Sequence, residues 1–413
     1  MKAGDAYIFI FVFSVLVLII GVFSRLIKNK LFVSIPLISV FAGILVGPQL
    51  CNILNPGSWD ESSAFMLEAA RITLAISLMG VALRIPHSFL KINKLRIPVF
   101  LFALMLVMFL VSSGLAFLLL GTGFWMAVLI GAIITPTDPV VSSSIVTGTM
   151  AKKYIPADIR HLISSESGAN DGLAVMFFLL PLLMIQNSAS IAITEWLKVI
   201  LWDVVIAGLI GVAIGWIAGK CFEKAEKRKW IDKPYFLGYS IAVSLLTLGI
   251  TRWIDSNAVF AVFIAGVSFS LVIKGSERQE EEKVQEAINH FFVIPVFLLF
   301  GMVLPWESWL DQSLGFYILI PAILLLRRLP WLLIFGRTIP ILDGRYERFF
   351  TGWFGPIGVA AIFYLSQASI QIGDHLIRNI GSAIIFASII LHGVTATPFT
   401  YLYRKFNQEK SGN

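Results

Sequence analysis

Long apolar runs recur along the whole chain and restrict the folds available to it. A helix needs about 20 residues to cross a bilayer, and runs of that order occur at 6–27, 31–50, 64–83, 96–120, 123–148, 160–186, 191–220, 234–253, 256–273, 286–304, 314–336, 347–370 and 379–402. Only 14% of the residues are charged, against about 25% in a soluble domain. The sequence therefore predicts an all-α membrane protein with about thirteen transmembrane helices.

Basic residues gather in alternate connections between these spans. They follow spans 1, 3, 5 and 7, at Arg25, Lys28, Lys30, Arg84, Lys91, Lys94, Arg96, Lys152, Lys153 and within 223–233. By the positive-inside rule these loops are cytoplasmic, the N-terminus is outside, and residues 403–413 form a short cytoplasmic tail. The dispersed net charge of +7 thus indicates topology in a cell membrane and no nucleic-acid partner. The charged segment 274–286 is predicted to be a solvated connector.

The motif TPTDPVV (135–141) lies in the middle of span 5. Pro136 and Pro139 have no N–H, so the carbonyl four residues before each loses its helical donor. Such orphan carbonyls are tolerated at membrane depth only inside protein or beside water. A proline kink would explain the prolines but leaves Asp138 between them unexplained, and an ionisable residue at mid-span indicates a functional site. We expect a broken helix at this position.

Span 6 carries a second polar group in HLISSESGANDG. Ser167 and Asp171 are four residues apart and share one helix face, while Glu166 and Asn170 share a neighbouring stripe. At 3.6 residues per turn, Glu166 and Asp171 point roughly 140° apart. We therefore expect the two carboxylates to meet different neighbours.

Span 11 places two adjacent arginines, Arg327 and Arg328, near its middle. An arginine buried there needs a counter-ion, and Glu166 is the candidate for either of them. This leaves Asp138 and Asp171 without an evident cation from the protein. An unmatched pair of buried carboxylates predicts a site for a cation.

Span 12 is interrupted at WFGPIG, where Gly355 and Pro356 break an apolar run. It follows the first broken span by seven spans, and interrupted segments at corresponding positions of two halves indicate an inverted-repeat transporter. We predict one transmembrane transporter domain over residues 1–413, with two inverted six-helix repeats, about 6–186 and 234–402, joined by a linking helix at 191–220. The two broken helices, spans 5 and 12, would cross and oppose their dipoles.

With these motifs, the chain resembles the NhaP-type sodium–proton antiporters, relatives of the eukaryotic sodium–hydrogen exchangers. The resemblance rests on TPTDPV, ESGAND, AGILVGP in span 2 and WFGPIG in span 12, and it covers essentially the whole chain. It implies that the two aspartates bind a cation or protons in alternation, with oxygen donors or supports beside them and a glutamate–arginine pair nearby. The residues carried over are Asp138, Asp171, Thr137, Ser167, Asn170, and Glu166 with Arg328 (or Arg327).

The chain departs from the family pattern at two places. Several relatives carry an acidic residue near the end of span 3, where Gly80 or Val81 stands here, which opens the choice of cation. Ile357 replaces the arginine of a frequent GxRG motif in span 12. Asn170 precedes Asp171 where an electrogenic branch has a second aspartate, so the resemblance implies electroneutral exchange.

These features together predict an antiporter that exchanges Na⁺, with Li⁺ or K⁺ as further candidates, for H⁺. The alternatives are K⁺ or NH₄⁺ exchange, or a passive cation channel that uses the same carboxylates as a selectivity element. An intramembrane aspartyl protease is disfavoured because its aspartates stand in YD and GxGD motifs, whereas these stand in PTDPV and AND. No enzyme activity and no cofactor are expected, and the resemblance implies a homodimer in the lipid bilayer.

Overall fold

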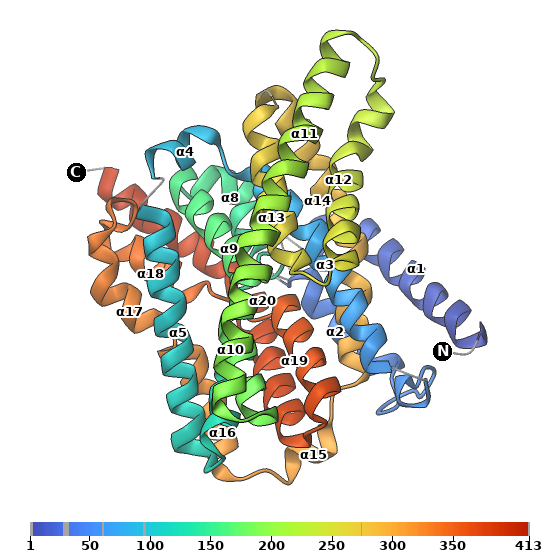
Figure 1. Cartoon of the computed structure of the whole chain (residues 1–413), viewed down its shortest axis with the longest axis vertical. Coiled ribbons are helices and arrows are strands. Elements are labelled where there is room, and N and C mark those ends of the chain that lie inside the picture. The colour runs from blue at the N-terminus through green and yellow to red at the C-terminus, as the bar shows by residue number, and fades with distance from the viewer. Residues whose placement is uncertain (1–2, 28–32, 60–61, 94–95, 274, 412–413) are drawn as a thin grey trace.

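The computed structural model describes residues 3–27, 33–59, 62–93, 96–273 and 275–411, and every regular element within them is a helix (Figure 1). This confirms the predicted all-α class. The basic residues Lys28, Lys30 and Lys94 lie outside the described residues.

The first four predicted spans coincide with helices that have no break. The elements of this region are α1 (Ala3–Leu26), α2 (Ile35–Val46), η2 (Pro56–Ser58), α3 (Ser62–Arg84), α4 (His87–Ile92) and α5 (Arg96–Leu120). The central residues of α3 are almost all buried, whereas α1 and α5 turn many large apolar side chains outward. α3 therefore belongs to the middle of the bundle and α1 and α5 to its margin.

Span 5 is broken, as TPTDPVV predicts. It consists of α6 (Phe124–Ile133), α7 (Ser143–Val146) and α8 (Gly148–Tyr154), and the long α9 (Ala157–Gln186) follows as span 6. α6 ends three residues before Pro136, and its freed carbonyls find other donors: Ala132 O accepts the N–H of Thr135 at 3.3 Å. The break lies inside the bundle, because residues 134–142 are all buried.

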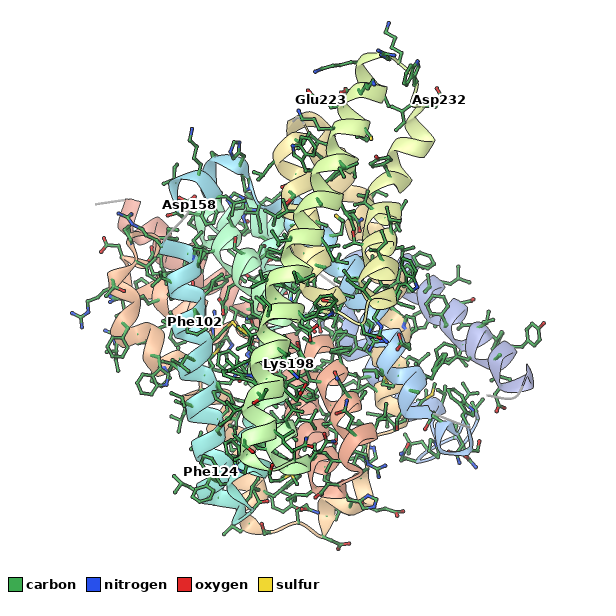
Figure 2. All side chains as sticks on the ribbon, in the orientation of Figure 1. Phe102, Phe124, Asp158, Lys198, Glu223 and Asp232 are labelled. Carbon is green, nitrogen blue, oxygen red and sulfur yellow. The ribbon has the colours of Figure 1, made fainter. Side chains whose placement is uncertain are left out.

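The linking segment is one long rod that runs along the front of the bundle (Figure 1). It comprises α10 (Ala189–Val199), a π-helical stretch η3 (Ile200–Ile206) and α11 (Ala207–Lys227), and it leads into α12 (Lys233–Trp253) and α13 (Ala258–Val272). The turn between α11 and α12 projects from one end of the molecule, where Figure 2 places Glu223 and Asp232. Phe102 and Phe124 instead lie on the flank formed by α5 and α6.

The prediction of a solvated connector at 274–286 is wrong for its described part. Residues 275–286 form the first turns of α14 (Gly275–Met302), because a run rich in Glu, Gln, Arg and Lys favours helix even when it is polar. Residue 274 is outside the described residues.

Span 11 was expected to be continuous but is divided at its two arginines. The elements here are α15 (Trp306–Leu310), α16 (Leu314–Leu326), α17 (Leu329–Phe335), η4 (Gly336–Thr338) and η5 (Pro340–Leu342). Pro330 sits in the first turn of α17 and has no N–H for the carbonyl of Leu326. The indole N–H of Trp331 donates to that carbonyl instead, at 3.0 Å.

Span 12 contains the second predicted break, between α18 (Arg345–Trp353) and α19 (Val359–Ile372), and α20 (His375–Ser411) completes the chain. The two breaks touch: the backbone N–H of Asp138 donates to Pro356 O at 2.8 Å. The predicted tail at 403–413 continues α20 as helix through Ser411.

Seven helices of the described residues are long and apolar enough to cross a membrane, and five more apolar helices are shorter. The exact number of thirteen crossings stays a prediction.

Candidate functional site

The crossing of the two broken helices is organised around the side chain of Asp138. One carboxylate oxygen accepts the backbone N–H groups of Val140 and Val141 (3.2 Å to the latter), and the other accepts the N–H of Val359. Val359 is the first residue of α19, so the carboxylate caps the positive end of that half-helix. A Cβ at Gly358 would overlap the Asp138 carboxylate. Glycine at this position therefore allows the close approach.

Arg327 binds the negative, C-terminal ends of two half-helices. Its guanidinium is buried and donates to Ile134 O, just beyond α6, and to Gly355 O, just beyond α18. Carbonyls at a helix C-terminus carry partial negative charge, which a cation stabilises. Arg327 thus binds the C-terminal ends of the first halves, α6 and α18. Asp138 binds backbone N–H groups on the other side of both breaks.

Arg328 lies beside Arg327 but has a different partner. Its Nη2 lies 2.7 Å from Glu166 Oε2, and its Nη1 bonds the other carboxylate oxygen. The same side chain donates to Thr351 O on α18 through Nε at 3.1 Å and Nη2 at 3.0 Å. Two parallel charge-assisted bonds make this a bidentate pair. Of the two arginines that the sequence left open, Arg328 is the one in contact with Glu166.

Three polar residues of spans 5 and 6 bond one another. Asn170 Oδ1 accepts the N–H of Thr137 at 3.2 Å, and Asn170 Nδ2 donates to Thr137 Oγ1 at 2.6 Å. The hydroxyls of Thr137 and Ser167 are 3.4 Å apart. This triad attaches α9 to the broken segment next to Asp138.

Asp171 differs from every other acidic residue of the site. It is fully buried, and neither carboxylate oxygen has a hydrogen-bond partner among the described residues. The Asp138 carboxylate is close enough to interact with it electrostatically. Its backbone carbonyl accepts the hydroxyl of Tyr364 at 2.8 Å. A buried carboxylate without donors is costly unless a proton or a cation neutralises it.

The sequence missed Tyr364 and Ser388, which supports the second break, whereas His392 is hydrogen-bonded inside the bundle, as expected of it. Tyr364 lies on α19 among apolar residues, and no spacing distinguishes it from a core aromatic. His392 contacts Trp353 O at 3.0 Å and Ser388 O at 2.9 Å, while Ser388 Oγ accepts the N–H of Ile357 at 2.7 Å. The bonds to Trp353 O and from Ile357 N–H satisfy backbone groups at the break.

Gly80 and Gln285 mark the place where several relatives were expected to carry an acid. A Cβ at Gly80 would lie 3.3 Å from Gln285 Cβ, so α14 packs against α3 at this position. Gln285 Nε2 donates to Ser240 Oγ at 3.0 Å, and its buried Oε1 has no hydrogen-bond partner in the described part of the chain. Gly80 therefore faces a neutral amide across the contact between α3 and α14.

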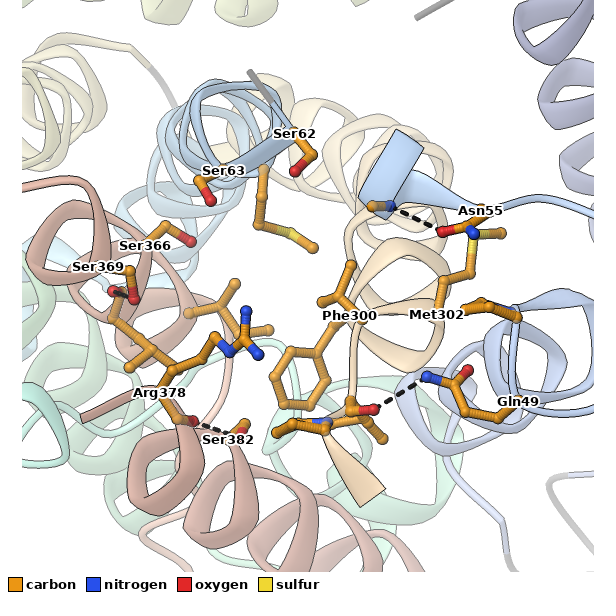
Figure 3. Close-up of a pocket in the computed structure, with 18 residues that line it drawn as sticks. Gln49, Asn55, Ser62, Ser63, Phe300, Met302, Ser366, Ser369, Arg378 and Ser382 are labelled. Atoms are coloured by element: carbon orange, nitrogen blue, oxygen red, sulfur yellow. Dashed lines mark hydrogen bonds between the residues drawn. The ribbon is translucent and has the colours of Figure 1, made fainter. Parts of the chain in front are cut away.

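A cavity of about 310 Å³ with polar residues along one side lies between α3, α14, α19 and α20 (Figure 3). Ser366 and Ser369 of α19, with Arg378 and Ser382 of α20, face it from one side, and Phe300 and Met302 of α14 from the other. Ser366 is two helical turns, about 10 Å at 1.5 Å per residue, from Val359, which bonds Asp138.

Comparison with known proteins identifies the family of the chain. The model of the family "Sodium/hydrogen exchanger, transmembrane" matches residues 12–401. The Na(+)/H(+) antiporter 2 of Zygosaccharomyces rouxii is 30% identical over 384 residues, which is 91% of this chain and 47% of that protein. A Na(+)/H(+) antiporter of Schizosaccharomyces pombe is 30% identical over 400 residues, which is 90% of this chain and 85% of that protein.

The fold has a close counterpart among solved structures. The sodium proton antiporter MjNhaP1 from Methanocaldococcus jannaschii superposes with a TM-score of 0.72 at 17% identity, covering 96% of this chain and 98% of that chain. The chain spans about half the length of the first curated relative it matches. The family match covers nearly the whole chain, and the fold superposes on that solved antiporter over almost its full length. The chain therefore belongs to the sodium/hydrogen exchanger family of multi-pass membrane transporters.

Proposed function

We propose that the chain exchanges a monovalent cation for H⁺ across the membrane, with Asp171 as the principal acceptor of both. The observation that carries this proposal is the fully buried Asp171 carboxylate, which has no hydrogen-bond donor among the described residues and lies beside Asp138. A proton and a monovalent cation each neutralise the single negative charge of that carboxylate, but both cannot occupy it together. Competition for one site couples the two ions.

The cation is Na⁺ in this proposal, with Li⁺ or K⁺ as weaker or alternative substrates. A hard cation is bound by several oxygens, and the neighbours of Asp171 supply hydroxyls from Thr137 and Ser167. Asn170 holds Thr137 in place. We propose an exchange of one cation for one proton, because Asn170 precedes Asp171 at the position where the electrogenic branch has a second aspartate.

Asp138 has a second role in this scheme, because three backbone N–H groups already bind its carboxylate. It fixes the crossing and contributes negative charge to the bound cation. The pair of Glu166 and Arg328 is structural, since each side chain satisfies the other.

Alternating access follows if only the loaded forms of the site reorient between the two faces. The polar cavity beside Ser366 offers the entrance on the outer face, and the basic loops mark the cytoplasmic face. We place the N-terminus outside, the end of α20 inside, and the protein in the cell membrane. The repeats at about 6–186 and 234–402 around the linking segment, and assembly as a homodimer, belong to the same proposal and draw their support from the family.

A pH-gradient dequenching assay in proteoliposomes tests the proposal against Na⁺, Li⁺, K⁺ and NH₄⁺. Wild type is expected to collapse an imposed proton gradient on addition of its cation, with saturation. Asp171→Asn should abolish this response at every pH. Asp158→Asn is the matched control, because Asp158 is an exposed carboxyl on the same helix, near its N-terminus (Figure 2).

Undiminished exchange by a folded Asp171→Asn variant would disprove the site. Flux that does not saturate and does not reverse with the direction of the pH gradient would indicate a passive channel instead. Exchange that is unaffected by an imposed membrane potential supports the electroneutral form.

A further inference from the structure

A groove of about 470 Å³ runs between α5 and α17 on the margin of the bundle. Its walls are almost wholly apolar and include Phe100, Leu104 and Val107 of α5, and Trp331 and Phe335 of α17. The rings of Trp331 and Phe335 are parallel, with centroids 6.2 Å apart. Neighbouring side chains such as Phe102 project outward along the same flank (Figure 2). In a membrane this groove faces lipid.

One end of the groove is strongly basic. Arg96, the first residue of α5, lines it directly. Arg337 lies between two other lining residues, Gly336 and Thr338. The stem of Arg348 packs against Gly336, since a Cβ there would lie 2.9 Å from Arg348 Cγ.

Among the described residues, Arg337 donates from Nε to Ile334 O at 3.3 Å, and its two terminal nitrogens are available for an anion. The Nε of Arg348 is buried and has no hydrogen-bond partner among the described residues. The described part of the chain shows no salt bridge from a carboxylate to any of the three arginines. An unsatisfied buried N–H beside an apolar groove is costly unless a ligand completes it.

The shape and charge of the groove identify the ligand class. An acyl chain matches the apolar walls, and a phosphate diester matches an arginine fork, which binds phosphate through parallel N–H bonds. The basic end is the beginning of α5, next to the loop that the positive-inside rule assigns to the cytoplasm, where anionic headgroups attract basic residues. We propose that the groove between α5 and α17 binds one anionic phospholipid, with its headgroup at Arg96, Arg337 and Arg348.

The lipid would contact the segment that carries the two site arginines. Trp331 bridges the break between α16 and α17 through its bond to Leu326 O, and Arg328 ends that break. The choice of the cytoplasmic leaflet rests on the proposed membrane orientation. Lipid binding itself does not depend on ion exchange.

The test measures lipid retention by the purified chain in detergent. Native mass spectrometry and thermal melting are compared with phosphatidylglycerol, with phosphatidylcholine of the same acyl chains, and with glycerol phosphate. Phosphatidylglycerol is expected to remain bound at least fivefold more than phosphatidylcholine and to raise the melting temperature. Arg96→Gln combined with Arg337→Gln should remove this preference.

One further variant tests recognition of the acyl chain separately from the headgroup, and another serves as a control. Ala103→Phe places a ring in the groove at an exposed lining position and should lower retention of phosphatidylglycerol without touching the arginines. Arg228→Gln removes one positive charge from an exposed arginine at the α11–α12 turn, away from the groove. This control should behave as wild type.

Equal retention of the two lipids, or an equal loss in Arg228→Gln, would overturn the proposal. So would the same stabilisation by glycerol phosphate alone, which would indicate a site for free phosphate esters. Because no ion gradient is used, loss of transport and loss of lipid binding are measured separately.

Discussion

Asp138 and Asp171 are equally buried, yet their surroundings are opposite. Asp138 accepts three backbone N–H groups at the crossing of two broken helices. Asp171, on an unbroken helix, accepts no hydrogen bond within the described residues. Residue type and depth are the same, so the difference lies in the backbone around each carboxylate. A helix break supplies free N–H groups, and an intact helix supplies none.

Glu166 represents the other extreme of this contrast, because its carboxylate is fully paired with Arg328. Replacing one partner of a buried pair leaves a lone charge and costs about 3–5 kcal/mol. Glu166→Gln should therefore give the largest loss of stability in the site, measured as the drop in melting temperature of the purified protein. The double variant with Arg328→Gln should recover part of the loss, and an additive loss would contradict the pairing.

Asp138→Asn and Asp171→Asn sharpen the comparison directly. Asn at 138 retains one acceptor oxygen but brings an N–H₂ group against backbone donors, and each buried donor left unsatisfied costs about 1–3 kcal/mol. We expect a lower melting temperature for Asp138→Asn and an unchanged or higher one for Asp171→Asn, although both lose exchange. Equal destabilisation by the two would show that Asp171 also has structural partners.

Asn170→Ala is expected to have the smallest effect. It removes two hydrogen bonds to Thr137, and a typical bond contributes about 0.5–1.5 kcal/mol. The cation concentration for half-maximal exchange should rise up to about tenfold, since 1.4 kcal/mol is one factor of ten, while the maximal rate changes little. Ala174→Ser, a similar small change one turn further along α9, controls for disturbance of that helix. A fall in maximal rate alone would argue against a role in cation binding.

The sequence predicted the helical class, both broken helices and the polar residues that surround Asp138 and Asp171, because proline, glycine and a carboxylate are conspicuous in an apolar run. It also restricted the partner of Glu166 to two adjacent arginines. It did not predict the break of span 11, where one proline in a first helical turn is also compatible with a continuous helix. It also assigned the charged start of α14 to a connector. A helix that extends beyond the bilayer carries the same polar residues as a loop, so composition does not distinguish the two.

Sequence alone thus determined which groups stand at membrane depth, since each is costly there and appears as an exception in the apolar pattern. The tertiary structure decided which of them are satisfied. Arg327 and Arg328 are neighbours in sequence, but one caps two helix ends and the other pairs with Glu166. The two aspartates likewise differ because, among the described residues, backbone N–H groups point toward the carboxylate of Asp138 and not toward that of Asp171. Such directions are set by how the broken helices cross, which residue order does not specify.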